Sequence, residues 1–135
     1  MCNCRFNCVF LAVIASLVLG AIATLLTITA AITVTPAFLW VLLGIAIVYL
    51  GITYFASAVS EPGRKCRCFC SALNAILVGI LGTIVTAVIL LGVSFAATSI
   101  IGALIVGALI FFFFLIITAT ACFIRCAFGC NRDID

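Results

Sequence analysis

Four long apolar stretches, separated by short polar breaks, dominate the hydrophobic pattern of the chain. None of them contains Asp, Glu, Lys, Arg or His, and each exceeds the roughly 20 residues that a helix needs to cross the hydrocarbon core of a bilayer. A backbone in lipid must form its hydrogen bonds within its own segment, so each stretch is predicted to be helical. The predicted spans cover residues 9–34, 37–59, 71–93 and 96–124.

The breaks between the spans are local. Pro36 lacks the N–H that a continuing helix would use, and residues 60–65 form the polar middle loop. Ala21, Ile22 and Ala23 carry the small residues of a signal-cleavage site, but the apolar stretch continues past them, so we interpret the first span as an uncleaved helix. The pattern predicts one all-α domain, residues 1–135, an integral membrane four-helix bundle built from two tandem transmembrane hairpins.

The composition supports a membrane protein and argues against catalysis. Hydrophobic residues make up 69% of the chain and charged residues 7%, whereas a soluble domain is nearer half apolar and a quarter charged. A cysteine nucleophile needs an activating base and a third group that orients the base. The chain has no histidine, and its only acids are Glu61, Asp133 and Asp135, so it offers no such arrangement. We therefore expect no enzymatic activity. The absence of a basic stripe argues against nucleic-acid binding.

The charges also predict an orientation. In a four-span chain the N-terminus, the middle loop and the C-terminus share one side. All six basic residues fall on that side: Arg5, Arg64, Lys65, Arg67, Arg125 and Arg132. The positive-inside rule then predicts a multi-pass protein with both termini and the 60–70 loop in the cytoplasm. The spans themselves lack the charges that mark ion pathways, which disfavours an ion-coupled transporter or a proton-driven pump.

An internal repeat relates the two predicted hairpins, residues 4–59 and 66–124. Shifting the sequence by 62 positions aligns Cys4 and Cys8 with Cys66 and Cys70, and nine of the 21 positions between 4 and 24 become identical. Biased composition alone would give roughly two identities, so the pattern favours a duplication. Both copies would have the same topology and be related by an axis along the membrane normal.

Small residues recur at four-residue spacing along three of the spans. Lipid is as apolar as leucine, so transmembrane helices associate through close packing at small side chains. Spacing of four places each set on one helical face. The residues predicted to pack helices together are Ala12, Ser16, Gly20 and Thr24 in the first span, Ala75, Gly79 and Thr83 in the third, and Ala103 and Gly107 in the fourth.

Nine cysteines form three triplets, all at or near the predicted cytoplasmic interface: Cys2, Cys4 and Cys8; Cys66, Cys68 and Cys70; Cys122, Cys126 and Cys130. Four interpretations remain open. Thiolates bind soft metal ions such as Cu(I), Zn or Fe, although the spacing fits common zinc patterns loosely. Disulfides would leave at least one cysteine of an odd number unpaired within the chain, but a cytosol keeps thiols reduced. Juxtamembrane cysteines are also sites of S-acylation, and cysteine is a tolerated small apolar residue.

These observations favour a non-enzymatic, structural membrane protein that self-associates in the bilayer, with the cysteine-rich cytoplasmic-side face forming cross-links or contacts. Its expected partners are the lipid bilayer and further copies of itself. The alternative is a thiolate-based, soft-metal-binding membrane protein, in which the nine cysteines would be the ligands. A small accessory protein acting on a partner complex is a third possibility, for which the sequence offers no residue to test.

Overall fold

The chain folds into four long helices, as the hydrophobic pattern predicts. A computed structural model describes the backbone of residues 4–31, 33–59, 67–93 and 100–130, and the side chains of residues 8–31, 33–59, 72–93 and 100–125. The helices are α1 (Cys4–Ile28), α2 (Pro36–Val59), α3 (Arg67–Gly92) and α4 (Ile100–Cys130), and the described residues contain no strand. Each helix is long and apolar enough to cross a membrane. The prediction of an all-α, multi-pass membrane bundle is confirmed.

The first helix ends at Ile28, before the end of the predicted span at residue 34. Ala30 adopts a left-handed conformation with φ of 56°. The Ala30 N–H donates to the Thr27 carbonyl at 3.1 Å, and the Ala31 N–H donates to the Leu26 carbonyl at 3.0 Å. This pair of hydrogen bonds is a Schellman motif, which satisfies carbonyls that the last helical turn would leave free. The apolar pattern cannot reveal this ending, because Ala30 and Ala31 are themselves compatible with a helix.

Replacing Ala30 with glycine is expected to stabilise the protein by about 1 kcal/mol, because a residue with a Cβ is strained in the left-handed region. The measurement is the free energy of unfolding in mixed detergent micelles, followed by helical circular dichroism. Ala31→Gly is the matched control, since Ala31 is exposed and has no positive φ. Equal effects of the two substitutions would contradict the assignment of this helix end.

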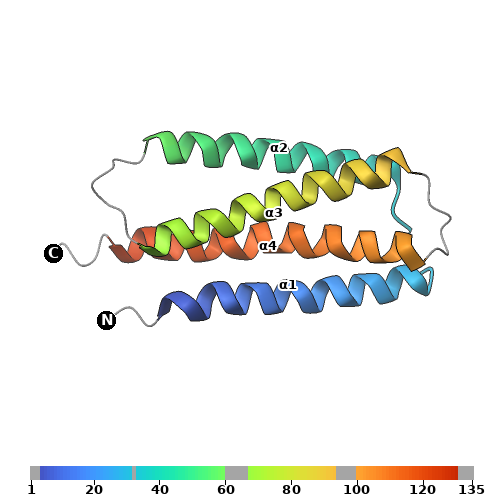
Figure 1. Cartoon of the computed structure of the whole chain (residues 1–135), viewed down its shortest axis with the longest axis horizontal. Coiled ribbons are helices and arrows are strands. Elements are labelled where there is room, and N and C mark those ends of the chain that lie inside the picture. The colour runs from blue at the N-terminus through green and yellow to red at the C-terminus, as the bar shows by residue number, and fades with distance from the viewer. Residues whose placement is uncertain (1–3, 32, 60–66, 94–99, 131–135) are drawn as a thin grey trace.

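The helices lie in the spatial order α1, α4, α3, α2 (Figure 1). The α4 helix packs between α1 and α3, and α3 packs between α4 and α2. Within the described residues, α1 makes no contact with α2, its neighbour in sequence, and only a slight contact with α3. The peripheral helices α1 and α2 therefore expose most of their surface, whereas α3 and α4 form the centre of the bundle.

Two clusters of buried side chains hold the centre together. Leu39 and Leu42 of α2 meet Ala87 of α3 and Leu109 of α4 in the first cluster. The second lies between α3 and α4 and contains Ile76, Ile80, Ile116 and Ala119. Together the clusters join α2, α3 and α4, but neither includes a residue of α1.

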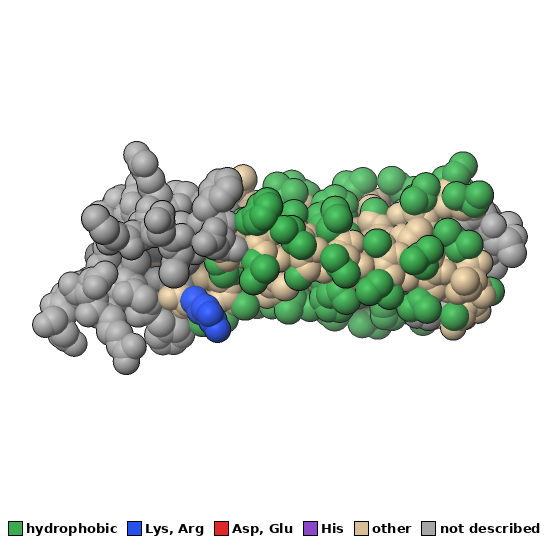
Figure 2. Space-filling view, turned by 90° about the horizontal axis from the view of Figure 1, so that it is seen from below, with side chains coloured by type: hydrophobic (Ala, Val, Ile, Leu, Met, Phe, Trp, Pro, Cys, Tyr) green, Lys and Arg blue, Asp and Glu red, His purple; other side chains and the backbone are tan. Residues whose placement is uncertain are grey.

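The outer surface of the described region is apolar, and Figure 2 shows hydrophobic side chains along most of its length. Among the side chains that the structure describes, Arg125 is the only charged one, and it is exposed. A soluble monomer rarely exposes such a large apolar area. This surface is suited to contact with lipid.

Candidate functional site

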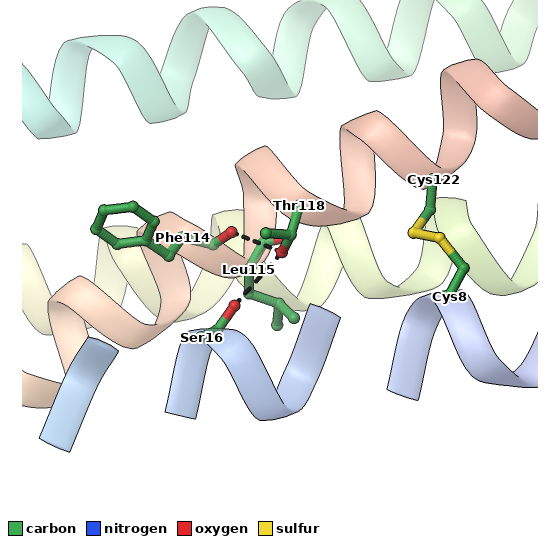
Figure 3. Close-up of a disulfide and its surroundings, with 6 residues drawn as sticks. All are labelled: Cys8, Ser16, Phe114, Leu115, Thr118 and Cys122. Carbon is green, nitrogen blue, oxygen red and sulfur yellow. Dashed lines mark hydrogen bonds between the residues drawn. A yellow bond between two sulfur atoms is a disulfide. The ribbon is translucent and has the colours of Figure 1, made fainter. Parts of the chain in front are cut away.

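One end of the bundle brings together the start of α1, the end of α2, the start of α3 and the end of α4 (Figure 1). We call it the cysteine end, and its described cysteines are Cys8 and Cys122. These two residues form a disulfide that joins α1 to α4, with Cα atoms 6.2 Å apart (Figure 3). Cys122 is buried and Cys8 is partly exposed. The bond spans 114 residues of sequence and fastens a peripheral helix to the centre of the bundle.

The other seven cysteines lie outside the described side chains. Five of them have helical backbone: Cys4 in α1, Cys68 and Cys70 in α3, and Cys126 and Cys130 in α4. Cys2 and Cys66 lie outside the described residues altogether. Because α4 continues through Cys130, residues 122, 126 and 130 follow one another at helical turns, as the four-residue spacing suggested.

The described residues contain no group of three metal-binding side chains. In the disulfide, Cys8 and Cys122 carry no thiolate, so they offer no metal ligand in this form. The chemistry available to the described part of the cysteine end is thiol–disulfide exchange.

Farther along the two helices from the disulfide, the contact between α1 and α4 continues through two hydroxyl side chains (Figure 3). Ser16 is fully buried and donates its hydrogen bond to the Ala12 carbonyl at 2.7 Å. Thr118 donates to the Phe114 carbonyl at 2.8 Å. The two hydroxyl oxygens lie 3.4 Å apart. Since each hydroxyl has a shorter hydrogen bond to a carbonyl of its own helix, this longer contact ties the two helices together only weakly.

Farther along α1, the backbones of the two helices approach closely at Gly20 and Gly107. A Cβ built on Gly20 would lie 2.9 Å from the Gly107 carbonyl oxygen and 2.9 Å from the Phe111 Cβ. A Cβ on Gly107 would collide with the Thr24 hydroxyl, which donates to the Gly20 carbonyl. Glycine is required at both positions because helix backbone occupies the space that a side chain would need.

Two glycines on α3 make similar close contacts with α4. A Cβ on Gly79 would lie 2.9 Å from the Ile116 side chain and 3.2 Å from the Phe112 carbonyl. A Cβ on Gly82 would collide with the Phe112 ring. The α4 helix is thus packed against glycines of both α1 and α3.

The structure places the small residues named from the sequence in two groups. Buried members are Ala12, Ser16, Gly20, Gly79, Thr83, Ala103 and Gly107, and partly buried members are Thr24 and Ala75. The four-residue spacing left out Gly82 and the aromatic residues Phe111 and Phe112 that pack on the glycines. The internal repeat contained a clue, because it aligns Gly20 with Gly82 and Thr24 with Thr86. Both threonines donate to the carbonyl of the glycine four residues before them.

The pairing of Cys8 with Cys122 could not be deduced from nine cysteines by spacing alone.

Comparison with protein families, with characterised proteins and with solved structures finds no match to this chain, so its function has to be inferred from its own geometry.

Proposed function

We propose that the chain is a non-enzymatic structural membrane protein that self-associates in the bilayer through one face of α2. Its cysteine end would form contacts or cross-links between copies. The observation that carries this proposal is that α2 exposes two glycines with no packing partner. No atom of the described chain lies within 4 Å of a Cβ built on Gly44 or Gly51. By contrast, Gly20, Gly79, Gly82 and Gly107 each abut a neighbouring helix.

A glycine inside a helix costs about 0.5–1 kcal/mol relative to alanine unless close packing requires it. Gly44 and Gly51 belong to a row of small residues at seven-residue intervals, completed by Ala37 and Ala58, and all four are exposed. The row lies on the side of α2 opposite Leu42 and the other residues that face α3. A seven-residue repeat keeps one face toward a partner along the length of two supercoiled helices.

Large side chains lie on both sides of this row: Trp40, Val41, Ile47, Val48, Tyr54 and Phe55. All of them are exposed, so the face alternates small and large residues along the helix. Two copies of such a face can place the large side chains of one helix beside the small residues of the other. We call this α2 surface the small-residue face.

The position of the cysteines supports a second kind of contact between copies. Nine cysteines less the Cys8–Cys122 pair leave seven, an odd number, so at least one has no possible partner within the chain. Such a thiol can exchange with a small-molecule disulfide, which forms a mixed disulfide and releases one small thiol. A thiolate of another copy can then attack the mixed disulfide, which links the two copies and releases the second small thiol. The cytoplasmic placement of the cysteine end, like self-association, is part of the proposal and is supported by the six basic residues on that side.

Soft-metal binding is the competing proposal. It is supported by the helical backbone through Cys130, which keeps Cys126 and Cys130 one turn apart. Metal analysis of protein purified anaerobically with reductant separates the two proposals. A stoichiometric content of Cu, Zn or Fe would favour the metal proposal, and metal-free protein would favour the structural one.

Self-association is tested by replacing Gly44 and Gly51 together with isoleucine. Their surroundings are open, so the fold should persist, whereas bulky side chains should keep two small-residue faces apart. We expect the association constant in lipid vesicles, measured by energy transfer between labelled copies under reducing conditions, to fall at least about tenfold, which is about 1.4 kcal/mol.

The matched control replaces Ala15 and Ala21 with isoleucine, because both are exposed small residues on α1. This control should associate as the parent chain does. A parent chain that remains monomeric at every protein-to-lipid ratio, or a double glycine variant that associates with unchanged affinity, would overturn the proposal.

A further inference from the structure

We propose that the Cys8–Cys122 disulfide is a redox latch that decides whether α1 stays docked against α4. The latch concerns contacts within one chain, so it is independent of self-association through α2. Three features carry the proposal: the peripheral position of α1, the lack of a strong hydrogen bond between its described side chains and α4, and the location of the disulfide at one end of its interface.

The first feature is that α1 depends on a single neighbour. It packs along α4, touches α3 only slightly, and does not contact α2 within the described residues. It also has the smallest buried share of the four candidate spans, and no residue of α1 belongs to a buried apolar cluster. In lipid, the exposed apolar side chains of α1 provide no drive toward the bundle, because lipid solvates them equally well.

The second feature is that the described hydroxyl groups of α1 find hydrogen-bond acceptors within α1. The hydroxyls of Ser16, Thr24 and Thr27 each donate to the carbonyl four residues earlier in the same helix. Ser16 also lies 3.4 Å from the Thr118 hydroxyl of α4, a distance at the long limit of a hydrogen bond. If α1 moves away from α4, it leaves no strong hydrogen-bond donor or acceptor unsatisfied. Docking without the disulfide therefore rests mainly on van der Waals packing around Gly20 and Gly107.

The third feature is the placement of the bond. The disulfide lies near the start of the α1 span, whereas the close glycine contact lies farther along the helix. With both ties in place, the helix is held at two levels, which prevents it from pivoting on α4. When the disulfide is broken, α1 is held to α4 only by non-covalent contacts, namely the packing at Ala12, Ser16 and Gly20, and is joined covalently to the bundle only by the segment leading to α2.

The exchange chemistry balances with a small-molecule thiol as reductant. A thiolate attacks the sulfur of Cys8, which is the more exposed partner, and forms a mixed disulfide. The Cys8–Cys122 bond breaks, and the released Cys122 thiolate takes up a proton. A second small thiol then attacks the mixed disulfide, releasing an oxidised small-molecule disulfide and the Cys8 thiol. The protein gains two electrons and two protons, and excess small-molecule disulfide reverses both steps.

The test measures the distance between α1 and α4 in the full chain. Spin labels are attached through non-canonical amino acids at Leu17 and Ile117, which are 61% and 45% exposed, so that all native cysteines remain. The chain is reconstituted at less than one copy per vesicle and equilibrated with oxidised or reduced glutathione. Alkylation and peptide mapping report the redox state of Cys8 and Cys122 in the same samples.

In the oxidised sample we expect a linked Cys8–Cys122 peptide and one narrow distance distribution. On reduction, the ratio of undocked to docked chains should rise at least about tenfold, because the second tether is lost. The double variant Cys8→Ser, Cys122→Ser should match the reduced chain under both conditions, whereas Cys70→Ser should behave as the parent does.

Distance distributions that do not change on reduction would overturn the latch, and so would free Cys8 and Cys122 thiols in the oxidised sample. If the double serine variant fails to insert, the comparison of oxidised and reduced parent chain decides the matter alone. Self-association does not affect the measured distances, since at this dilution few vesicles hold more than one chain. The experiment can therefore contradict the latch without bearing on the proposed α2 interface, and the association measurement can contradict the interface without bearing on the latch.

Discussion

Replacing Gly107 with leucine is expected to push α1 away from α4 at this contact and to lower the free energy of unfolding by about 3 kcal/mol, at the upper end of typical overpacking costs. The physical reason is that the new side chain would occupy space held by the Thr24 hydroxyl and the Gly20 carbonyl oxygen. A flexible side chain could rotate away, but the Gly20 carbonyl belongs to helix backbone. The helices themselves must therefore move apart. Steric trapping or denaturant titration in mixed micelles measures the change.

Gly92→Leu provides the matched control, because Gly92 ends α3 and is exposed, and a Cβ added there would meet no atom of the described chain within 4 Å. It should leave the free energy of unfolding nearly unchanged. Gly107→Ala should be destabilising to a smaller degree, and Thr24→Ala should partly rescue it by removing the nearest colliding atom. A double-mutant cycle without coupling between residues 24 and 107 would contradict the close contact.

Leu109→Ala is expected to destabilise the protein by about 2 kcal/mol, at the low end of the usual range for leucine truncation. Leu109 is fully buried and joins α4 to Leu39 and Leu42 of α2 and to Ala87 of α3. In a bilayer the unfolded helices remain in lipid, so the transfer of apolar surface contributes little. The cost arises because the side chains around the new cavity no longer have the leucine atoms to attract by dispersion.

The matched control for this truncation is Leu104→Ala on the same helix, where the side chain is 58% exposed. Removing a side chain that already contacts lipid should change the free energy of unfolding by less than about 0.5 kcal/mol. Equal destabilisation by Leu104→Ala and Leu109→Ala would contradict the burial of the Leu109 face of α4 against α2 and α3.

The candidate site was only partly predictable. Four-residue spacing identified Gly20 and Gly107 as candidates for helix packing, and the structure places them against each other. The same reasoning passed over Gly44 and Gly51, whose seven-residue spacing belongs to a different kind of helix pairing. Nothing local distinguishes these two pairs of glycines, because all four lie within continuous apolar helices. Whether a glycine packs against another helix depends on which helix lies opposite it, and no helix lies opposite Gly44 or Gly51 in the described chain.

The amino-acid sequence by itself determined the number of spans, their helical state and the placement of charges outside them. The reason is that a chain inside hydrocarbon must form all of its backbone hydrogen bonds within the protein. A single run of about 20 apolar residues can do so only as an α-helix. The apolar pattern did not determine where each helix ends, as the left-handed Ala30 shows, because a helix end formed by backbone hydrogen bonds needs no polar side chain.

The tertiary structure alone decided which helices touch and which cysteines meet. Each helix is apolar on every side, so no hydrophobic stripe marks the face that turns inward. Side-by-side order is then set by the fit between surfaces, such as Phe111 against Gly20 and Phe112 against Gly82. That fit places α1 on α4 instead of on α2. It thereby brings Cys8 to Cys122 across 114 residues, a pairing determined by helix packing and not by spacing along the chain.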